Sequence, residues 1–378
     1  MASDAIRLGR RVVAGFGVGP SVRLRGRESV LVVGPSQSGK TSSLVVPALL
    51  SWTGPVVVTS VKRDVLVATR PWRTALGRVT VLEPGRDDGL TWDPMEGVTT
   101  LRHALRVARE LAHPEGGRDN ADFWNALASK LVAALMVRAV ELGRTIFDVA
   151  TVVEDREFGS WAEGPGDAAR IVRSFLDHAP RTLDGVATTA ETMLLAWRFA
   201  QPCARVRDVV GGSHSLYLCA PRAEIAHFEG LLRGALRAVL DEQRARADAG
   251  AALPLLLALD EAVAVAPLDD LDHLAATLAS QRVTLVTVAQ DFAQIASRFG
   301  DRAATIVNNH SARVVLAGLT DPTAARYLPE AESESSPLRR RPPGTAVVVA
   351  GSRPPSVVAL RPWWRSRRLR RRGARAPH

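Results

Sequence analysis

The chain has 378 residues, 46% hydrophobic and 23% charged, which is typical of a folded protein with one large domain or two medium ones. Its two cysteines, Cys203 and Cys219, are too few for a disulfide framework and lack metal-ligand spacing, so we expect reduced thiols. Much of the net charge of +10 lies in residues 361–378, whose eight arginines have no acidic neighbour and leave about +2 for the rest.

No segment is expected to cross a membrane. Residues 1–11 are basic, but no sustained apolar stretch follows them as in a secretory leader. Residues 41–61 carry no charge over a length that could span a bilayer. Thr53-Gly54-Pro55 interrupts this stretch, so a core helix followed by a buried strand explains it better. We therefore expect a cytoplasmic protein.

Residues 1–28 are predicted to form a basic arm with a short edge strand, because Val22–Arg25 alternates apolar and basic residues. The apolar run Val30–Val33 then predicts a buried strand. A Gly-x-x-x-x-Gly-Lys-Thr pattern follows at residues 34–41, and Ser42–Val46 suits the start of a helix. Strand, glycine-rich turn and helix together are typical of a phosphate-binding loop.

This loop is expected to bind ATP and Mg²⁺. Gly34 and Gly39 would allow backbone conformations closed to residues with a Cβ, so that successive N–H groups curl around an anion. Lys40 would reach the β- and γ-phosphates and support catalysis, and the Thr41 hydroxyl would bind the metal. Only three of the 49 basic residues are lysines, so a lysine at this position strengthens the interpretation as a phosphate-binding loop. The predicted nucleotide-binding residues are Gly34, Pro35, Ser36, Gln37, Ser38, Gly39, Lys40, Thr41 and Ser42.

The remaining pattern predicts an α/β fold with a parallel-dominated central sheet. Val56–Thr59 and Val79–Leu82 are expected strands, after which helical periodicity dominates residues 99–204. We expect this block to be an all-α insertion into a nucleotide-binding domain formed by residues 29–98 and 205–360. Later elements alternate in the same way: strands at 215–219, 255–259, 283–289, 313–316 and 345–349, and helices at 223–247 and 268–281.

A second diagnostic element follows the apolar strand Leu255–Leu259. It ends in Asp260 and Glu261, which suits a Walker B site. Asp260 would contact Mg²⁺ opposite Thr41, and Glu261 would polarise the attacking water. The alternative is an ordinary acidic residue at a strand end that caps a helix. Gln290, at the end of a neighbouring strand, could sense the γ-phosphate or orient water, or could be a solvated strand end.

The order of these motifs resembles the coupling ATPases of conjugation and type IV secretion, a TraG/TraD-like family related to septal DNA translocases. Lys62-Arg63-Asp64 partly matches that family's Lys-Gly-Glu turn, and Phe123-Trp124 matches its Phe-Trp in the helical domain. Leu216-Tyr217-Leu218 before Pro221, and Asp321–Leu328 near the end, are also similar to it. Members usually carry N-terminal membrane helices, and we find none in this sequence.

The resemblance implies a RecA-like P-loop NTPase core that assembles as a homo-oligomer, commonly a hexamer, around DNA. ATP would bind between subunits, and an arginine from the neighbouring subunit would complete its binding site. Arg282 and Arg313 are candidates for this arginine. The implied function is an ATP-driven DNA translocase for conjugative transfer, with relaxase or secretion-channel components as partners. Alternatives are a motor for protein recruitment or for plasmid or chromosome partition, and a weakly hydrolysing nucleotide-dependent scaffold.

The basic tail, residues 361–378, is expected to be a flexible arm, because Gly373 and the final Ala-Pro disfavour a stable helix. Its arginines and Trp363-Trp364 suit sequence-independent contact with DNA phosphates and bases. The same composition suits the anionic inner leaflet of the cell membrane, which attracts polybasic segments. A solvated charge run is the alternative.

Overall fold

The structure is a computed structural model that divides into two compact units. The first unit holds residues 1–80, 208–221 and 240–378, and the second holds residues 81–207 and 222–239. Parts of the N-terminal arm, Leu328 of the Asp321–Leu328 motif and residues 375–378 of the basic tail lie outside the described residues. The described residues are 6–12, 19–24, 28–86, 89–112, 119–199, 202–221, 223–262, 268–327, 341–351 and 353–374.

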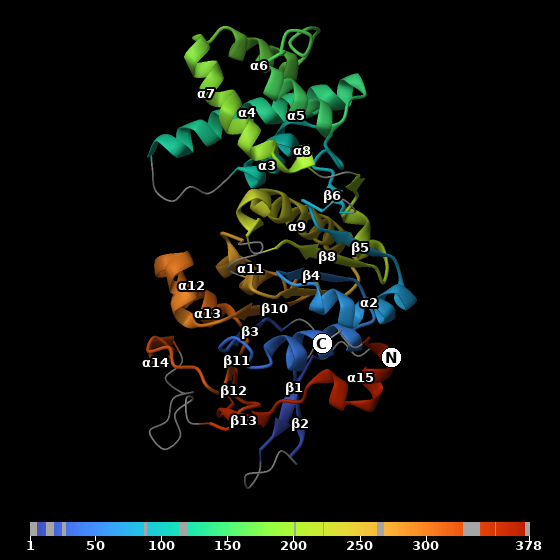
Figure 1. The fold of residues 1–378 in the computed structure, drawn as a ribbon, viewed down its shortest axis with the longest axis vertical. Coiled ribbons are helices and arrows are strands. Elements are labelled where there is room, and N and C mark those ends of the chain that lie inside the picture. The colour runs from blue at the N-terminus through green and yellow to red at the C-terminus, as the bar shows by residue number, and fades with distance from the viewer. Residues whose placement is uncertain are drawn as a thin grey trace. The chain divides into compact units, whose positions relative to one another are not determined.

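The first unit is built on an eleven-stranded sheet in the order β2-β1-β13-β12-β11-β3-β10-β9-β4-β8-β5 (Figure 1). The strands from β11 to β8 pair in parallel, and the strands from β11 to β2 pair antiparallel. Every residue of β3, β4, β8, β9 and β10 is buried, which explains their unbroken apolar runs. The predicted parallel-dominated sheet is confirmed. The bounds are Ile6–Arg11 (β1), Ser21–Leu24 (β2), Val30–Val33 (β3), Val56–Ser60 (β4), Val79–Leu82 (β5), Ser215–Cys219 (β8), Leu255–Leu259 (β9), Val283–Ala289 (β10), Ala312–Leu316 (β11), Thr345–Ala350 (β12) and Ser356–Ala359 (β13).

The edge of this sheet corrects one prediction. β1 is a strand, whereas the sequence around it predicted only a basic arm. Ile6 and Leu8 are buried while the three arginines of the strand are exposed, so the basic residues concealed an amphipathic strand. β1 pairs with β13 on one side and with β2 on the other, which leaves β2 as the predicted edge strand.

The helices of the first unit connect these strands. The helix after the Gly-Lys-Thr sequence begins with a π-helical turn, η1, and continues as α1, whose first turn contains Pro47. Such π turns are often found at functional sites. The predicted helix at 268–281 is shorter in the structure. The bounds are Thr41–Val45 (η1), Val46–Ser51 (α1), Asp64–Leu76 (α2), Leu271–Thr277 (α11), Phe292–Phe299 (α12), Gly300–Arg302 (η3), Ala303–Asn309 (α13), Ala324–Tyr327 (α14), Trp363–Arg365 (η6) and Arg367–Arg372 (α15).

The second unit is mostly helical. Its central helix, α4, packs against α3, α6 and α7, and Thr145 and Asp148 form a reciprocal capping box at the start of α5. A short parallel pair joins β6 to β7. The bounds are Leu101–Leu111 (α3), Asp119–Leu142 (α4), Ile146–Asp155 (α5), Asp167–Leu176 (α6), Pro180–Leu194 (α7), Ala196–Phe199 (α8), Thr91–Trp92 (β6) and Cys203–Ala204 (β7). Helix α9, Ile225–Asp248, contributes residues to both units, because the boundary along the chain falls between Val239 and Leu240.

One helix among the described residues is long and apolar enough to span a membrane by length and composition. It is Ala121–Leu142 of α4, and 56% of its most apolar window is buried inside the structure. Leu131, Val132 and Leu135 are fully buried, as expected for the core helix of a globular unit. The stretch 41–61, in contrast, is a helix followed by the buried strand β4, as its sequence predicted.

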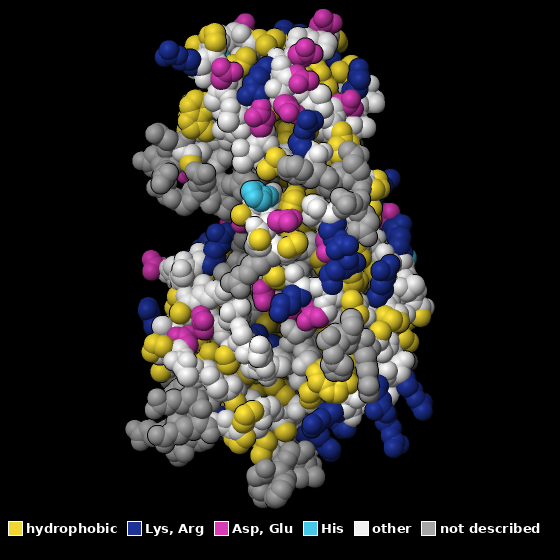
Figure 2. Space-filling model, in the orientation of Figure 1, with side chains coloured by type: hydrophobic (Ala, Val, Ile, Leu, Met, Phe, Trp, Pro, Cys, Tyr) yellow, Lys and Arg dark blue, Asp and Glu magenta, His cyan; other side chains and the backbone are white. Residues whose placement is uncertain are grey.

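The C-terminal segment is not the expected flexible arm over the residues described. Residues 367–372 form helix α15, which packs against α1 and α2, and its arginines gather beside those of β1 and β2 (Figure 2). The Arg372 guanidinium donates to the carbonyl of Leu50 at 2.8 Å and lies over the Trp72 ring at 3.9 Å from its centroid. These tertiary contacts stabilise a helix that would be too short to form alone. Gly373 lies just after the helix, where glycine does not weaken it.

Candidate nucleotide-binding site

The Gly34–Thr41 loop joins the buried strand β3 to η1, as the pattern predicted, but its two glycines serve different purposes. Gly39 has φ of +89°, a left-handed conformation that favours glycine. Gly34 does not have a positive φ; a Cβ there would lie 2.7 Å from the Leu316 Cβ and 3.0 Å from Ser38 Oγ. The prediction that Gly34 supplies an unusual backbone conformation is therefore wrong, since its role is close packing against β11. Gln37, with φ of +62°, bends the loop instead.

Lys40 is half-buried at the head of η1. Its ammonium donates to the carbonyls of Gly34 and Pro35, the second at 2.8 Å, so the side chain curls over the loop that precedes it. Burial lowers the pKa of Lys40, and the nearby carboxylates of Asp260 and Glu261 act in the opposite direction. A partly desolvated ammonium held against the backbone of the loop is suited to binding a phosphate there.

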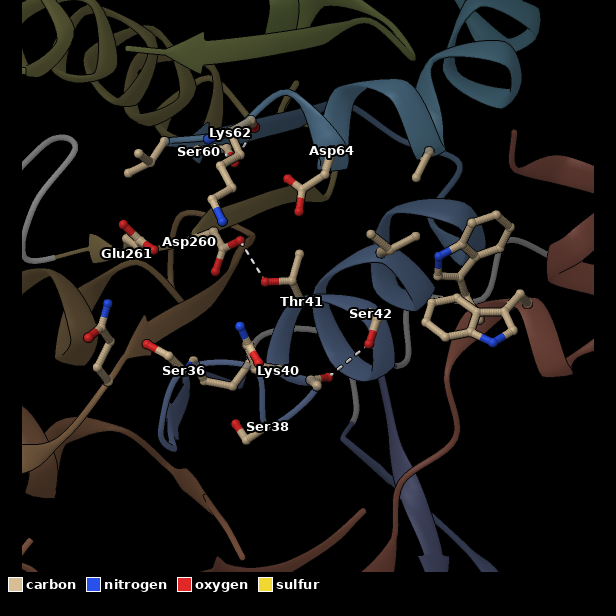
Figure 3. Close-up of a pocket in the computed structure, with 18 residues that line it drawn as sticks. Ser36, Ser38, Lys40, Thr41, Ser42, Ser60, Lys62, Asp64, Asp260 and Glu261 are labelled. Carbon is tan, nitrogen blue, oxygen red and sulfur yellow. Dashed lines mark hydrogen bonds between the residues drawn. The ribbon is translucent and has the colours of Figure 1, made fainter. Parts of the chain in front are cut away.

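Thr41 and Asp260, 219 residues apart in the chain, meet in the site (Figure 3). The Thr41 hydroxyl donates to Asp260 Oδ2 at 2.9 Å, and Thr59 on β4 donates to the Asp260 backbone carbonyl at 3.1 Å. Asp260 follows β9, which lies between β10 and β4, so its position is fixed on both sides. Burial raises the pKa of Asp260 to about 6, assisted by Asp64, against the hydrogen bond from Thr41 that lowers it.

Glu261 and Gln290 lie at the carboxyl ends of neighbouring strands. Glu261 has φ of +55°, a left-handed conformation that is costly for a residue with a side chain and is concentrated at functional sites. The Gln290 backbone N–H donates to Gln294 Oε1 at 3.3 Å, which ties the end of β10 to the start of α12. Both residues line one cavity of about 790 Å³ together with the Gly34–Thr41 loop. The structure therefore brings the predicted site residues together.

The same cavity has lining residues that sequence reasoning had not assigned to it. Ser60 ends β4, Lys62 lies in the turn that follows and Asp64 begins α2, whereas Trp363 and Trp364 come from η6. The Asp64 side chain points toward Thr41, and Lys62 extends toward Asp260 (Figure 3). Lys62 could have been found, because it is one of only three lysines and lies in a turn already matched to a family motif. The tryptophans gave no comparable signal, since only the fold brings them here.

Arg282 and Arg313, the candidate arginines for a neighbouring subunit, do not line this cavity. The Arg282 carbonyl accepts from Leu255 N–H at the amino end of β9, the opposite edge of the sheet from Asp260. Arg313 is in β11, where it is paired with Leu31 of β3. Neither residue therefore completes the site of its own chain.

The oxygen groups at the site fit a magnesium ion. Mg²⁺ is usually held by one or two carboxylates, with water and substrate phosphates completing its shell. A hydroxyl and a carboxylate oxygen already converge at Thr41 and Asp260, with Asp64 nearby. Among the residues that the structure describes, no group of three or more His, Cys, Asp or Glu forms a metal cage. This donor set suits a metal shared with a bound phosphate.

The fold and site define a RecA-like P-loop NTPase. A family model described as Type IV secretory system Conjugative DNA transfer matches residues 5–191, and one described as TraM recognition site of TraD and TraG matches residues 254–336. Two Escherichia coli proteins named Conjugal transfer protein TraG are 24% and 23% identical over 321 and 323 residues, covering 73% of this chain. The chain spans about half the length of these curated relatives, since 50% of each is covered.

Solved structures agree with this fold. The plasmid coupling protein TrwB in complex with ADP and Mg²⁺ superposes with a TM-score of 0.70 at 16% identity, covering 94% of this chain and 93% of that one. VirB4 of Thermoanaerobacter pseudethanolicus gives a TM-score of 0.56 at 14% identity, covering 94% and 96%. The solved structures show the shared fold, and the two matching family models show that the chain belongs to the conjugative coupling protein family.

Proposed function

We propose that this chain is an ATP-driven DNA translocase that pumps DNA during conjugative transfer through a type IV secretion system. The observation that carries the proposal is the meeting of Thr41 and Asp260 beside a phosphate-binding loop, with Glu261 and Gln290 on the same cavity. A protein that only bound nucleotide would not need an acidic residue in Glu261's position. The TrwB structures with ADP and Mg²⁺ and with a non-hydrolysable ATP analogue support nucleotide and Mg²⁺ as ligands.

Each residue has a distinct role in this proposal. The Gly34–Thr41 loop and Ser42 hold the phosphates, and Lys40 exchanges its carbonyl partners for the β- and γ-phosphates. Thr41 and Asp260 hold Mg²⁺, which when bound neutralises charge that develops on the phosphates. Glu261 orients and polarises the attacking water, and Gln290 contacts that water or the γ-phosphate. Together these roles would support hydrolysis of the γ-phosphate by water.

Assembly and partners follow from the family rather than from this single chain. We propose a homo-oligomer, a hexamer, in which an arginine from one subunit reaches the nucleotide of the next. DNA would pass through the ring without sequence recognition, and relaxase or secretion-channel components would contact the assembly. The protein would work in the cytoplasm at the inner face of the cell membrane. Movement of protein substrates, plasmid or chromosome partition, and a nucleotide-dependent scaffold are the competing functions.

The decisive experiment measures ATP turnover by the purified chain with and without DNA. Turnover that DNA stimulates supports a DNA motor, turnover that DNA leaves unchanged supports a protein-directed motor, and negligible turnover with retained ATP binding supports a scaffold. Lys40→Ala should lose nucleotide binding, because the desolvated cation is its phosphate contact. Glu261→Gln should keep binding while turnover falls by about two or more orders of magnitude, since only the water-polarising carboxylate is lost.

Matched controls separate these effects from general damage. Lys130→Ala removes another lysine, and Glu157→Gln makes the same carboxylate-to-amide change at an exposed position of the second unit. Both controls should bind and hydrolyse ATP as the wild type does. Equal loss of nucleotide affinity in Lys40→Ala and Glu261→Gln would contradict the assigned division of roles.

A further inference from the structure

The cavity at the Gly34–Thr41 loop has a second, apolar end that the phosphate chemistry does not use. Val46, Ala68, Trp363 and Trp364 line it in addition to the polar groups. Its volume of about 790 Å³ is within the ~300–1,000 Å³ range of small-molecule sites, which combine an apolar lining with a few polar groups. The apolar end is therefore suited to a part of the ligand other than its phosphates.

The two tryptophans differ in how much of each ring is available. Trp363 is 5% exposed and belongs to the core, whereas Trp364 is 43% exposed although its neighbour is buried. Their rings meet edge to face, with centroids 5.9 Å apart and an interplanar angle of 82°. Trp363 thus supports Trp364 from the side while Trp364 keeps surface exposed at the cavity.

The ring pair is held in place by the segment after it. A Cβ on Gly373 would lie 2.6 Å from the Trp363 ring, so that ring packs directly against the backbone after α15. The Ala374 N–H donates to the Ala68 carbonyl at 3.2 Å, which brings the same segment to a residue that lines the cavity. Arg372 adds its bond to Leu50 and its contact with Trp72. The Trp364 indole is therefore presented by a packed element.

The apolar lining residues lie one helical turn or more beyond the residues that would hold the phosphates and the metal. Val46 follows Thr41 by five residues, across the π-helical turn η1. Ala68 follows Asp64 by one turn of α2. Phosphates held at the loop would thus place the rest of a nucleotide beside Val46, Ala68 and the tryptophans.

We propose that Trp364 stacks on the base of the nucleoside triphosphate whose phosphates the Gly34–Thr41 loop holds. This inference rests on the proposed function and adds the base subsite to it. Every nucleobase has a π face, so a stacking contact holds a base without reading its identity. The subsite therefore accepts the purine nucleotides ATP and GTP with similar affinity, and it makes η6 part of the nucleotide site.

The test compares a ligand that has a base with one that lacks it. Trp364→Ala should weaken Mg-ATP binding by about tenfold, equivalent to about 1.4 kcal/mol, because base–aromatic stacking is lost. Binding of Mg-tripolyphosphate should stay within about twofold of the wild type, since its contacts lie at the loop. Trp364→Phe should restore most ATP affinity, and Trp161→Phe, which makes the same change in the second unit and outside the cavity, should leave it unchanged.

Fluorescence gives an independent readout. The emission difference between the wild type and Trp364→Phe isolates Trp364 among eight tryptophans, and it should change with ATP but not with tripolyphosphate. Wild-type ATP affinity in Trp364→Ala would overturn the inference, as would equal weakening of both ligands, which indicates damage to the loop or a contact with a neighbouring chain. A wild-type chain that binds neither ligand would instead overturn the proposed function, and the inference with it.

Discussion

Protonation of His310 should destabilise the fold as pH falls. His310 directly follows α13, is 1% exposed, and has Nδ1 at 2.7 Å from the Ile306 carbonyl and Nε2 at 2.8 Å from Thr287 Oγ1. The carbonyl can only accept, so Nδ1 carries the proton and the Thr287 hydroxyl donates to Nε2. A second proton on the ring would take away that acceptor and place a charge inside the core.

The size of the effect comes from the pKa. Burial, assisted by the positive charge of Arg313, lowers the pKa of His310 from 6.5 to about 4, against the hydrogen bond to Ile306. Below pH 6.5 His310 is protonated in the unfolded chain, whereas in the folded chain it stays neutral until about pH 4. The contribution of His310 to the free energy of unfolding is therefore complete above pH 6.5 and is lost as pH falls toward 4. The full shift corresponds to about 3 kcal/mol, of which about 2 kcal/mol is lost between pH 7.5 and pH 5.

Urea unfolding at pH 7.5 and pH 5 measures this loss. His310→Gln removes the titrating group. Between pH 7.5 and pH 5 the free energy of unfolding of this variant should therefore decrease by about 2 kcal/mol less than that of the wild type does. His273→Gln makes the same change at an exposed position of α11 and should follow the wild type. If His310→Gln loses as much stability on acidification as the wild type, the reasoning on the buried imidazole is wrong.

Two further predictions concern the loop and the assembly. Gly34→Ala should lower stability by about 1–3 kcal/mol in thermal melting because its Cβ meets Leu316, whereas Gly159→Ala, with open space around it, should have little effect. If a neighbouring subunit completes each ATP site, turnover per chain should rise with protein concentration, and sedimentation should show nucleotide- or DNA-promoted rings. A strict monomer with full DNA-stimulated activity would refute that arrangement.

The parts of the fold that sequence predicted best are those with local physical causes. A strand buried on both faces must be apolar throughout, so β3, β4, β9 and β10 could be located to within a residue or two. Asp260 could be paired with Thr41 because the carboxyl ends of parallel strands lie at one edge of a sheet, where α/β proteins bind ligands. Both inferences needed only the local pattern and the topology that it implies.

The parts that sequence missed depend on distant residues. The reason for a glycine at position 34 is Leu316, which approaches it through the pairing of β3 with β11. The amphipathic pattern of β1 was concealed because its exposed residues are arginines that match the rest of the arm. Trp364 reaches the cavity only because α15 packs on α1 and α2. No local pattern in the sequence could have placed these residues.

Helix α15 also changes how the basic segment should be tested for DNA binding. Deleting residues 366–378 would remove Arg372, which binds the Leu50 carbonyl, and Gly373, which packs against Trp363. An effect of this deletion on DNA binding could then come from lost charge or from lost structure. Arg367, Arg368 and Arg371 are exposed on the same helix, so replacing them with Gln removes charge alone.

The arginines of α15 adjoin a basic surface rather than stand alone. Burial lowers the pKa of Arg7 on β1, and the positive charges of Arg10, Arg23 and Arg361 lower it further, so these arginines lie close together. A cluster of arginines suits a phosphate backbone, since each neutralised phosphate releases counterions. A control should remove the same charge elsewhere on the molecule. Three exposed arginines of the second unit provide it: Arg102, Arg170 and Arg181.

The triple Gln variant of α15 should weaken DNA binding and flatten its dependence on salt. Each lost phosphate contact reduces the slope of log affinity against log salt concentration by about 0.9 for duplex DNA, so three contacts correspond to a change of about 2.7. Basal ATP turnover should stay near that of the wild type, because these arginines do not line the nucleotide cavity. The control variant should change the slope less, since its charges are dispersed.

An unchanged affinity and slope in the α15 variant would exclude a DNA contact there. A loss confined to binding of anionic vesicles would assign the cluster to the membrane surface instead, where about 1 kcal/mol per basic residue is expected.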